Sequence, residues 1–411
     1  MIVSSTPPIH LTYCLNVHSG ETWPEVVEVI RTKASTVRDA VAGGEPFGLG
    51  LRLSAQAGEQ LLHGDTLTEF KCWLADNGFY VFTINGFPYG QFHNTAVKAD
   101  VYRPDWTTPN RRDYTIRLLD ILSRLLPAGQ VGSISTVPIT FKPWAASSGH
   151  IQSAVKMLAE SAAHAHDLHT RTGRDIVIAL EPEPCCLLET TTETIDFFQG
   201  PLLRYGARHL TRQYGITREA ADAIVKKHVG VCFDTAHQMV EYENIPESVS
   251  ALRDAGIRIG KIQLSSALRL APTTKNIGLL DQFADGVYLH QVSSQLGDDG
   301  GITLMPDLPD ATTNPEMRNA DQWRVHFHVP LFFNECMGLA NTSDELTGRF
   351  AELIRDGICP HIEIETYTWG VLANAMANVD PIDGIIREFD WVRKNILTAE
   401  PADKRSKQAR R

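Results

Sequence analysis

Short apolar runs alternate with longer segments of helical spacing along most of this chain. The runs are rich in β-branched and aromatic residues and end in polar or Gly/Pro-containing stretches, which is typical of buried strands. Eight such strands are predicted, at residues 10–17, 47–53, 79–85, 132–138, 175–181, 229–234, 258–264 and 361–366. Because each is followed by at least one helical segment, the pattern predicts eight βα units.

The helical segments share apolar positions spaced by three or four residues. They are predicted at residues 23–41, 60–77, 113–126, 150–172, 193–214 with 217–227, 245–255, 343–356 and 380–397. Eight strands with eight helical segments are the repeat of an α/β fold, the (β/α)8 TIM barrel. A doubly wound open sheet gives a similar alternation, but the count of eight and the polar residues at nearly every strand end favour the barrel. No glycine-rich nucleotide loop follows the first strand.

One segment departs from this repeat. Residues 267–333 separate the seventh strand from its helix and include Gly/Asp-rich and Pro-rich stretches. Such long loops in a compact domain are commonly functional, so we predict a small β-rich insertion over the barrel mouth, with residues 325–331 returning toward the seventh strand. We expect a single domain over residues 1–397 and a disordered basic tail over 398–411.

Charge limits the partners that this chain can be expected to have. The whole chain carries 38 basic and 49 acidic residues, a net charge of −11. Five basic residues lie in the last eight positions, which leaves 33 against 49 and a net charge of −16 for residues 1–403. Nucleic-acid binding needs a clustered basic surface, so an acidic body argues against such a partner.

The seven cysteines are scattered and form no C-x-x-C pair. This spacing indicates neither a disulfide framework nor a structural zinc site, and it favours a reducing cytoplasm. No leader pattern opens the chain and no apolar run is long enough for a membrane span, so we expect neither export nor membrane insertion.

Candidate chemistry gathers at the carboxyl ends of the strands, which meet at one mouth of a barrel. Glu181, Asp234 and Glu365 end strands five, six and eight, and His237 follows Asp234 by three residues. Oxygen and imidazole donors without a thiolate suit Mg²⁺, Mn²⁺, Co²⁺, Fe²⁺ or Zn²⁺. Glu181 and Asp234 also have simpler interpretations as an acid at a helix start and a helix cap. Glu365 shares one strand face with Glu363, which packing does not explain.

Other polar residues suggest further ligands. His326 and His328 share one face of a strand-like run, where two imidazoles can bind one metal or remain ordinary buried histidines. Arg52 and Lys142 could hold a phosphate or carboxylate, or pair with the acids at the mouth. The predicted substrate-binding residues are Asn85, Arg52, Lys142 and Lys261.

The motifs LEP at strand five, FDTAH at strand six and IEIET at strand eight resemble those of the xylose-isomerase-like superfamily of sugar and sugar-phosphate isomerases and epimerases, to which AP endonucleases are related. The resemblance implies a TIM barrel and a divalent metal held by Glu181, Asp234, Glu365 and a histidine on strand seven, with His237 as a further ligand.

The histidine on strand seven is missing, because the chain reads Gly260-Lys261-Ile262-Gln263 there. Either the amide oxygen of Gln263 or a histidine of the HFHVP run, represented by His328, takes its place in the expected metal site. The departure bears on activity and leaves the expected fold unchanged.

Longer segments, among them HLTYCLNVHSGETWPEV, YVFTINGFPYG and IEIETYTWGVL, look like the metabolite traffic protein E family of bacterial ebo gene clusters. That resemblance implies handling or export of a secondary metabolite or its precursor, with other proteins of the same cluster as possible partners. The resemblance implies a pathway in which the protein works, but it does not imply a chemical reaction.

The leading hypothesis is a metal-dependent isomerase, epimerase or lyase acting on a small polyhydroxylated metabolite. Glu181 and Glu365 would be metal ligands and candidate bases, Asp234 a ligand, and His237 a ligand or a substrate-orienting group. The alternative is a barrel that binds or carries a metabolite without catalysis, favoured by the missing histidine. Nucleic-acid repair is disfavoured by the acidic body.

Overall fold

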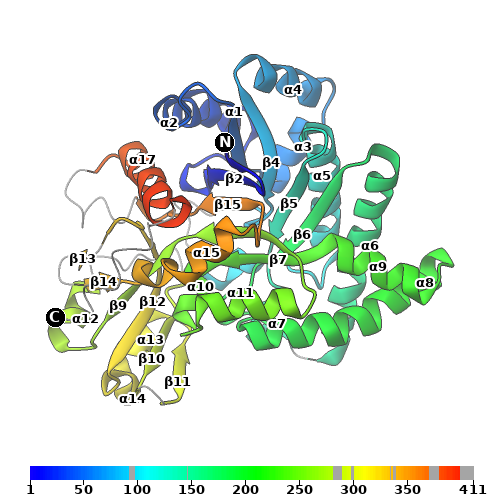
Figure 1. The fold of residues 1–411 in the computed structure, drawn as a ribbon. Helices are drawn as coiled ribbons and strands as arrows, with labels where there is room; N and C mark the ends of the chain where they lie inside the picture. Colours follow the sequence, from blue (N-terminus) through cyan, green and yellow to red (C-terminus); the bar gives the residue numbers. More distant parts are fainter. Residues whose placement is uncertain are drawn as a thin grey trace.

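The computed structural model describes residues 1–91, 98–145, 147–280, 289–297, 300–333, 335–336, 339–369 and 379–398 (Figure 1). Apart from Thr398, the predicted basic tail lies outside the described residues. The predicted fold class is confirmed: the chain forms an α/β barrel with a second, antiparallel sheet beside it.

Eight parallel strands form the barrel wall, and they match the eight predicted runs. Around the wall the order is β2-β15-β8-β7-β6-β5-β4-β3, and β1 adds an antiparallel edge to β2. The strands are β1 (Ile2–Ser5), β2 (Pro8–Tyr13), β3 (Phe47–Arg52), β4 (Phe79–Asn85), β5 (Val131–Thr136), β6 (Asp175–Leu180), β7 (Val229–Asp234), β8 (Ile259–Leu264) and β15 (His361–Ile364). The first strand ends four residues earlier than predicted, because the chain turns into η1 (Leu15–Val17).

The barrel closes where β2 meets β3, and a glycine makes the closure possible. A parallel bridge joins Cys14 to Gly50, and the Thr12 hydroxyl donates to Gly48 O (2.7 Å) while accepting from Gly50 N–H (3.1 Å). A Cβ on Gly50 would lie 2.0 Å from Glu363 Oε1. Any larger residue at position 50 would therefore force the closing strands apart.

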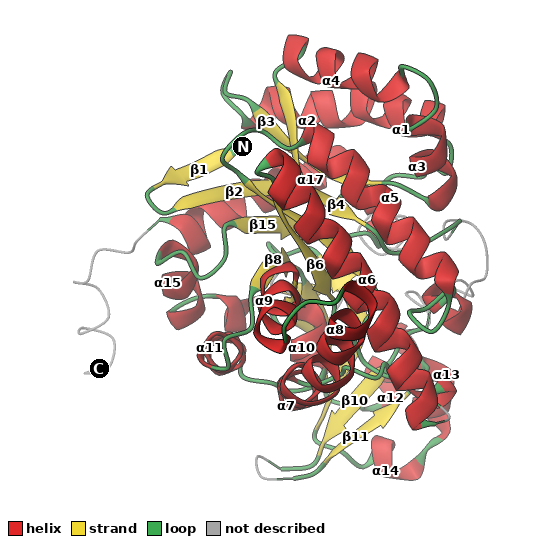
Figure 2. Cartoon of the chain, turned by 90° about the vertical axis from the view of Figure 1, so that its right-hand side faces the viewer, coloured by secondary structure: helices red, strands yellow, loops and turns green. Residues whose placement is uncertain are grey.

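Helices surround the barrel wall, with their apolar faces packed on the strands (Figure 2). Their bounds are α1 (Trp23–Val29), η2 (Ile30–Ala34), α2 (Ser35–Val41), α3 (Ala55–Leu61), α4 (Thr66–Asp76), η3 (Lys98–Tyr102), α5 (Pro109–Leu125), η4 (Lys142–Trp144), α6 (Ser148–Thr172), α7 (Thr191–Phe197), η5 (Phe198–Ala207), α8 (Arg208–Tyr214), α9 (Arg218–His228), α10 (Thr235–Val240), α11 (Ile245–Asp254), η6 (Ser343–Leu346), α15 (Arg349–Arg355), α17 (Pro381–Val392) and η7 (Arg393–Leu397). Within the described part of the chain, no helix has both the length and the apolar character needed to cross a membrane.

One predicted helix is two in the structure. Residues 60–77 were expected to form a single helix, whereas α3 ends at Leu61 and α4 begins at Thr66. Gly64 between them has a φ of +58°, a left-handed conformation that ends a helix and costs glycine little. The apolar spacing continues across this break, which is why periodicity alone did not reveal it.

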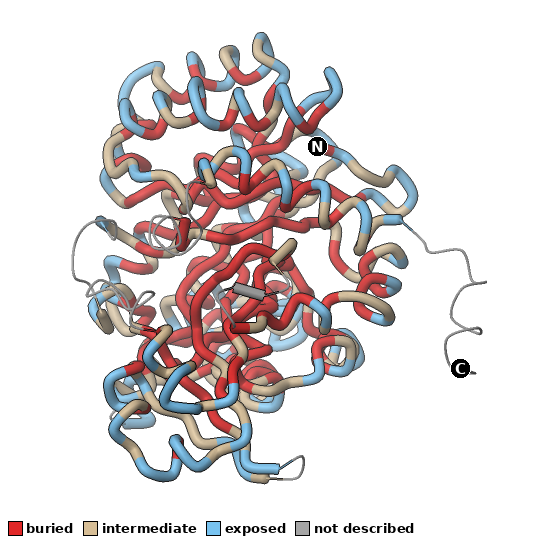
Figure 3. The backbone as a smooth tube through the Cα atoms, turned by 90° about the vertical axis from the view of Figure 1, so that its left-hand side faces the viewer, coloured by how far each residue is buried: buried red, intermediate tan, exposed pale blue. Residues whose placement is uncertain are grey.

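The insertion forms an antiparallel sheet in the order β11-β10-β12-β9-β14-β13. Its strands are β9 (Ser266–Leu270), β10 (Val292–Gln295), β11 (Ile302–Met305), β12 (Gln322–Val329), β13 (Glu335–Cys336) and β14 (Leu339–Asn341), with α12 (Thr274–Leu280), α13 (Leu308–Thr313) and α14 (Pro315–Arg318) in its connections. It has its own buried cluster around Trp323 and Phe327, while its outer connections are exposed (Figure 3). As predicted, β12 returns to pair with the segment that follows β8.

A register irregularity in β12 positions its histidines. Val325 pairs with Leu268 and Val329 with Ser266, so β12 carries two more residues between these points than β9 does. Such bulges bend a strand and re-aim its side chains, and they are common beside active sites. Here the bulge carries His326 and His328, which are both buried.

A charged network lies inside the barrel below its mouth. Lys261 donates to Glu363 Oε2 and to Asn85 Oδ1 (both 2.7 Å), and the Asn85 amide donates to Glu363 Oε1 (2.9 Å). Lys261 and Glu363 are both fully buried. Each charge is therefore tolerable only while the other is present.

Removing one partner of this pair should destabilise the protein. We expect Lys261→Met to lower the free energy of unfolding by about 3–5 kcal/mol, because it leaves an uncompensated buried carboxylate. The double variant Lys261→Met with Glu363→Gln should recover much of that loss. Urea unfolding followed by tryptophan fluorescence measures both, and equal losses in the single and double variants would contradict the interpretation.

A second buried carboxyl, Glu388 on α17, holds this helix to the mouth. Its Oε1 accepts hydrogen bonds from the Thr366 hydroxyl (2.7 Å) and from Leu331 N–H (3.1 Å). Burial raises the pKa of Glu388 to about 8, against the opposing effect of these two hydrogen bonds. Folding therefore takes up a proton at this group between its usual pKa of 4.5 and about 8.

Because the folded-state pKa of Glu388 is raised, its contribution to stability should be lost as pH rises through this window. We expect the stability of the wild type relative to Glu388→Gln to fall by up to about 1.4 kcal/mol per pH unit between pH 5 and 8. Unfolding midpoints across that range measure the difference. The half-exposed Glu352 on α15 provides a control variant, Glu352→Gln, and a pH dependence unaltered in Glu388→Gln would refute the assignment.

Candidate metal centre

A pocket opens at the mouth of the barrel, where the carboxyl ends of the parallel strands meet. It spans about 620 Å³ including its opening and extends under the antiparallel sheet. Its lining comprises Asn16, Phe87, Pro88, Lys98, Val101, Tyr102, Glu181, Glu183, His237, Leu289, His326, His328, Glu365 and Tyr367. Apolar walls therefore enclose a set of acidic and imidazole side chains, the usual composition of a small-molecule site.

Asp234 ends β7 and has two separate tasks. Its Oδ1 accepts from the backbone N–H groups of Ala236 (2.7 Å) and His237 (3.2 Å), which caps α10, and from the Ser265 hydroxyl (2.9 Å). Its Oδ2 is buried and has no hydrogen-bond partner among the described residues. Both interpretations from the sequence thus describe one residue: one oxygen caps a helix and the other is available to a ligand.

Glu365, just after β15, is fixed in a similar way. The Asn16 side-chain amide from η1 donates to Glu365 Oε1 (3.1 Å), and Glu365 N–H donates to Leu264 O (3.0 Å). Its Oε2 is buried without a partner in the described part of the chain. Glu181, immediately after β6, is held through its N–H to Thr136 O (3.1 Å), and its side chain lines the pocket.

The electrostatics of these three carboxyl groups are strongly coupled. Burial, followed by the charge of Asp234, raises the pKa of Glu181 well above its usual value. Burial and the charges of Glu181 and Asp234 do the same to Glu365. Burial also works against the charged form of Asp234, but His237, His328 and hydrogen bonds hold its pKa below the usual value. A bound cation would relieve this repulsion.

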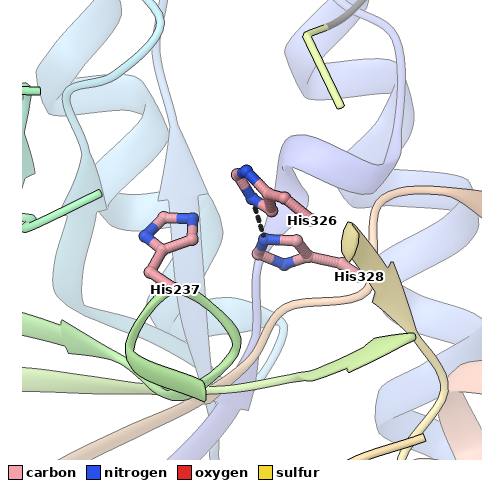
Figure 4. Close-up of side chains that lie close together, drawn as sticks. All are labelled: His237, His326 and His328. Atoms are coloured by element: carbon pink, nitrogen blue, oxygen red, sulfur yellow. Dashed lines mark hydrogen bonds between the residues drawn. The ribbon is translucent and has the colours of Figure 1, made fainter. Parts of the chain in front are cut away.

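Three histidines converge beside the carboxyl groups (Figure 4). His237 comes from α10, and His326 and His328 come from β12 of the insertion. The His237 ring centroid lies 4.6 Å from that of His326 and 5.3 Å from that of His328. Burial lowers the pKa of His237 to about 4 and that of His326 well below its usual value, so both rings are neutral at physiological pH.

The donor atoms of this centre form three overlapping groups. The groups are Glu181 with Asp234 and His237, Asp234 with His328 and Glu365, and His237 with His326 and His328; within each, the donor atoms lie within 4.8 Å of one another. Carboxylate oxygens that are buried without a partner among the described residues, beside neutral imidazoles, are a donor set for a divalent metal. The residues at this mouth therefore fit the predicted cation.

Glu183 follows Glu181 by two residues and also lines the pocket. Tyr102 Oη donates to Glu183 Oε1 (2.7 Å), whereas Glu183 Oε2 is buried without a partner among the described residues. Burial raises the pKa of Glu183 to about 8. It is therefore a proton donor at neutral pH that faces the pocket.

The predicted substrate-binding residues lie elsewhere. Arg52 pairs with Glu21 (2.9 Å), and Lys142 pairs with Glu189 and with Glu193 (3.0 Å); neither lines the pocket. Asn85 and Lys261 belong to the network inside the barrel. Gln263 lies on β8 with its Oε1 accepting from the Cys232 thiol (2.8 Å), while His328 is the residue whose ring reaches Asp234 and Glu365.

Several residues of the site carried no usable signal in the sequence. Tyr102 belongs to η3 after β4, and Gln291 lies at the edge of the insertion, so neither has a periodic context. Asn16 and Glu183 were visible as polar residues at strand ends, and that position was the signal for them. Ser265, which binds Asp234, resembles an ordinary strand-end serine in the sequence.

Comparisons with known proteins address the fold. No family model and no curated protein matches the chain. Among solved structures, the apo form of 3-keto-D-glucoside 4-epimerase from E. coli is 13% identical, with a TM-score of 0.42 over 94% of this chain and 99% of that one. The probable 3-DHS dehydratase of petrobactin synthesis from Bacillus anthracis is 12% identical, with a TM-score of 0.44 over 94% and 99%.

A third solved structure is the IOLI protein with a bound zinc atom, which is 11% identical, with a TM-score of 0.46 over 95% of this chain and all of that one (100%). Similarity at this level assigns no reaction, substrate or ligand residue to the present chain.

Proposed function

We propose that this protein is a metal-dependent isomerase or epimerase, or a lyase of related chemistry, that acts on a small polyhydroxylated metabolite. The observation that carries the proposal is a pair of buried oxygens, Asp234 Oδ2 and Glu365 Oε2, that have no hydrogen-bond partner among the described residues. Asp234 and Glu365 share one donor group with His328, and both Glu365 and His328 line the pocket. Glu181 and His237 adjoin this group. A divalent ion held there would polarise a substrate carbonyl or hydroxyl and stabilise negative charge developing on its oxygen.

Other side chains of the pocket supply a proton-transfer group and an apolar wall, which such a reaction also needs. Glu183 is placed to give up or accept a proton, since it faces the pocket and titrates near neutrality. Glu181 and Glu365 remain candidate bases where they are not engaged by the ion. Phe87 stacks on Tyr102 at 5.9 Å between ring centroids, and such aromatic walls suit the apolar face of a sugar while excluding water.

An uncharged substrate fits this pocket better than a phosphorylated one. Lys98 is the basic residue in the lining, and it is paired with Asp307 (2.7 Å). Arg52 and Lys142, which were expected to bind an anion, are paired with acids outside the lining. A phosphate in the pocket would therefore meet several carboxyl groups without a free counter-charge among the described lining residues.

The resemblance to the xylose-isomerase-like superfamily and to the metabolite traffic protein E family gives this proposal its setting. In that setting the metabolite belongs to a secondary-metabolite route, the protein works in the cytoplasm, and other products of the same gene cluster are its partners. The runner-up is a barrel that binds or carries the metabolite without transforming it.

Metal binding tests the proposal at its base. We expect the chelator-stripped protein to take up at least about one equivalent of Mn²⁺ or Zn²⁺ that survives gel filtration, as measured by elemental analysis. Asp234→Asn retains the oxygen that caps α10 but removes the charge, so it should weaken Mn²⁺ binding about tenfold or more while preserving the fold. Glu352→Gln is the control, and less than about a tenth of an equivalent on the wild type would overturn the proposal.

Exchange of substrate hydrogen with solvent deuterium distinguishes an enzyme from a carrier that only binds the metabolite. Isomerisation or epimerisation through proton transfer next to a carbonyl should incorporate deuterium from D₂O into a ketohexose such as D-fructose or D-psicose, as detected by NMR. Glu183→Gln should slow the exchange by about 10²-fold or more while leaving metal content unchanged. Binding of these sugars without exchange by the metal-loaded wild type would favour the carrier.

A further inference from the structure

The three histidines of the centre have their protons placed by their surroundings. His237 Nδ1 faces Pro182 O (3.1 Å) and His328 Nδ1 faces Glu365 O (2.9 Å). Main-chain carbonyl oxygens only accept hydrogen bonds, so both Nδ1 atoms must carry a proton. In a neutral ring, the Nε2 atom of His237 and that of His328 then carry no proton and present a lone pair.

The tautomer of His326 is fixed through Gln291. The Gln291 Nε2 group donates to Pro184 O (3.2 Å) and to Tyr102 Oη (3.2 Å), and a carbonyl partner permits only this orientation of the amide. Gln291 Oε1 is therefore the atom that faces His326 Nδ1 (2.7 Å), and it accepts the proton of that nitrogen. The Nε2 atom of His326 therefore also carries no proton and presents a lone pair.

The consequence is a close contact between two acceptors. His326 Nε2 lies 3.1 Å from His328 Nε2, and both rings are more than nine-tenths buried. With both Nδ1 protons fixed, two neutral rings have no proton to place between these atoms. Two imidazole nitrogens bound at about 2.0–2.1 Å to one tetrahedral ion lie roughly 3.3–3.4 Å apart, so the observed 3.1 Å requires only a small widening to admit an ion.

The six donors of the mouth also exceed what one open metal site uses. Catalytic sites commonly keep three protein ligands and leave a position for water or substrate. Asp234 lies in one donor group with Glu181 and in another with Glu365, and His237, His326 and His328 form a group of their own. A hydrogen bond that each imidazole donates through its other ring nitrogen to an outer acceptor is what orients metal-binding histidines, and all three rings make one.

We infer that the mouth binds two divalent cations: one at a carboxylate site around Asp234, with Glu181 and Glu365 as its further donors, and one at an imidazole site of His237, His326 and His328. The first is the ion of the proposed function, and the inference rests on that function only for this ion. With both ions bound, the single lone pair of His328 belongs to the second ion. The imidazole site favours Zn²⁺ and similar borderline ions, whereas the carboxylate site accepts Mn²⁺ or Mg²⁺.

Metal stoichiometry and spectroscopy test the inference without an activity assay. We expect chelator-stripped wild type to bind about two equivalents of Zn²⁺ by calorimetry and elemental analysis. His326→Gln should bind about one, while Asp234→Asn should retain tight Zn²⁺ binding at the imidazole site. His164→Gln, at a half-buried histidine of α6 that pairs with Asp120, is the matched control and should still bind two.

A measurement on the unmutated protein guards against variants that fail to fold. With one equivalent of Co²⁺ added to protein already loaded with Mn²⁺, the imidazole site should give the strong visible absorption of tetrahedral cobalt. His326→Gln should lose that absorption while its thermal midpoint stays close to that of the control.

The outcomes separate the two proposals. If the wild type binds one equivalent of metal, and this binding is lost in Asp234→Asn but kept in His326→Gln, the imidazole site is overturned and the proposed function stands. No binding by the wild type would overturn both. Two equivalents, of which one depends on His326 and the other on Asp234, would support both.

Discussion

Asp234 divides its two carboxyl oxygens between the fold and the site, and the arrangement of the mouth depends on this division. One oxygen caps α10 and receives Ser265, which fixes the turn that follows β7 and places His237. The other is buried and has no partner among the described residues. Burying a carboxylate oxygen without a hydrogen bond is costly, so this oxygen is suited to a ligand at the mouth.

The antiparallel insertion completes what the barrel begins. The barrel contributes carboxyl groups at its strand ends and one histidine from α10, and the bulged strand β12 of the insertion adds two more imidazoles. Three sets of contacts hold the insertion in place. Strand β12 pairs with β9, Glu388 of α17 accepts a hydrogen bond from Leu331 N–H, and Lys98 forms an ion pair with Asp307. It therefore works as a fixed wall of the pocket, built from the loop that the barrel repeat could not explain.

Much of this architecture could be predicted from the sequence because it depends on local patterns. The eight strands followed from apolar runs with polar ends, and strand-end positions gave Glu181, Asp234, His237 and Glu365. The ion-pair partners of charged residues are not set by local sequence. Lys142 pairs with Glu189 and Glu193, and Arg52 pairs with Glu21, and no spacing rule predicts these pairs. The turn at Gly64 interrupted a helix whose apolar period continued.

The choice between Gln263 and His328 shows the same limit in the site itself. Alternation placed His326 and His328 on one strand face, yet only the path of the insertion decides where that face points. The bulge in β12 adds two residues against β9 and is set by long-range pairing. In the structure the ring of His328 reaches the carboxyl groups, while the amide of Gln263 accepts from Cys232.

Anomalous diffraction at the zinc edge, from crystals of the full chain grown with Zn²⁺, tests most directly whether this mouth is a metal centre. We expect anomalous peaks within bonding distance of Asp234 Oδ2 and Glu365 Oε2 and of the Nε2 atoms of the histidines. Crystals without such peaks, in which these two carboxyl oxygens share a proton or bind only water, would contradict it.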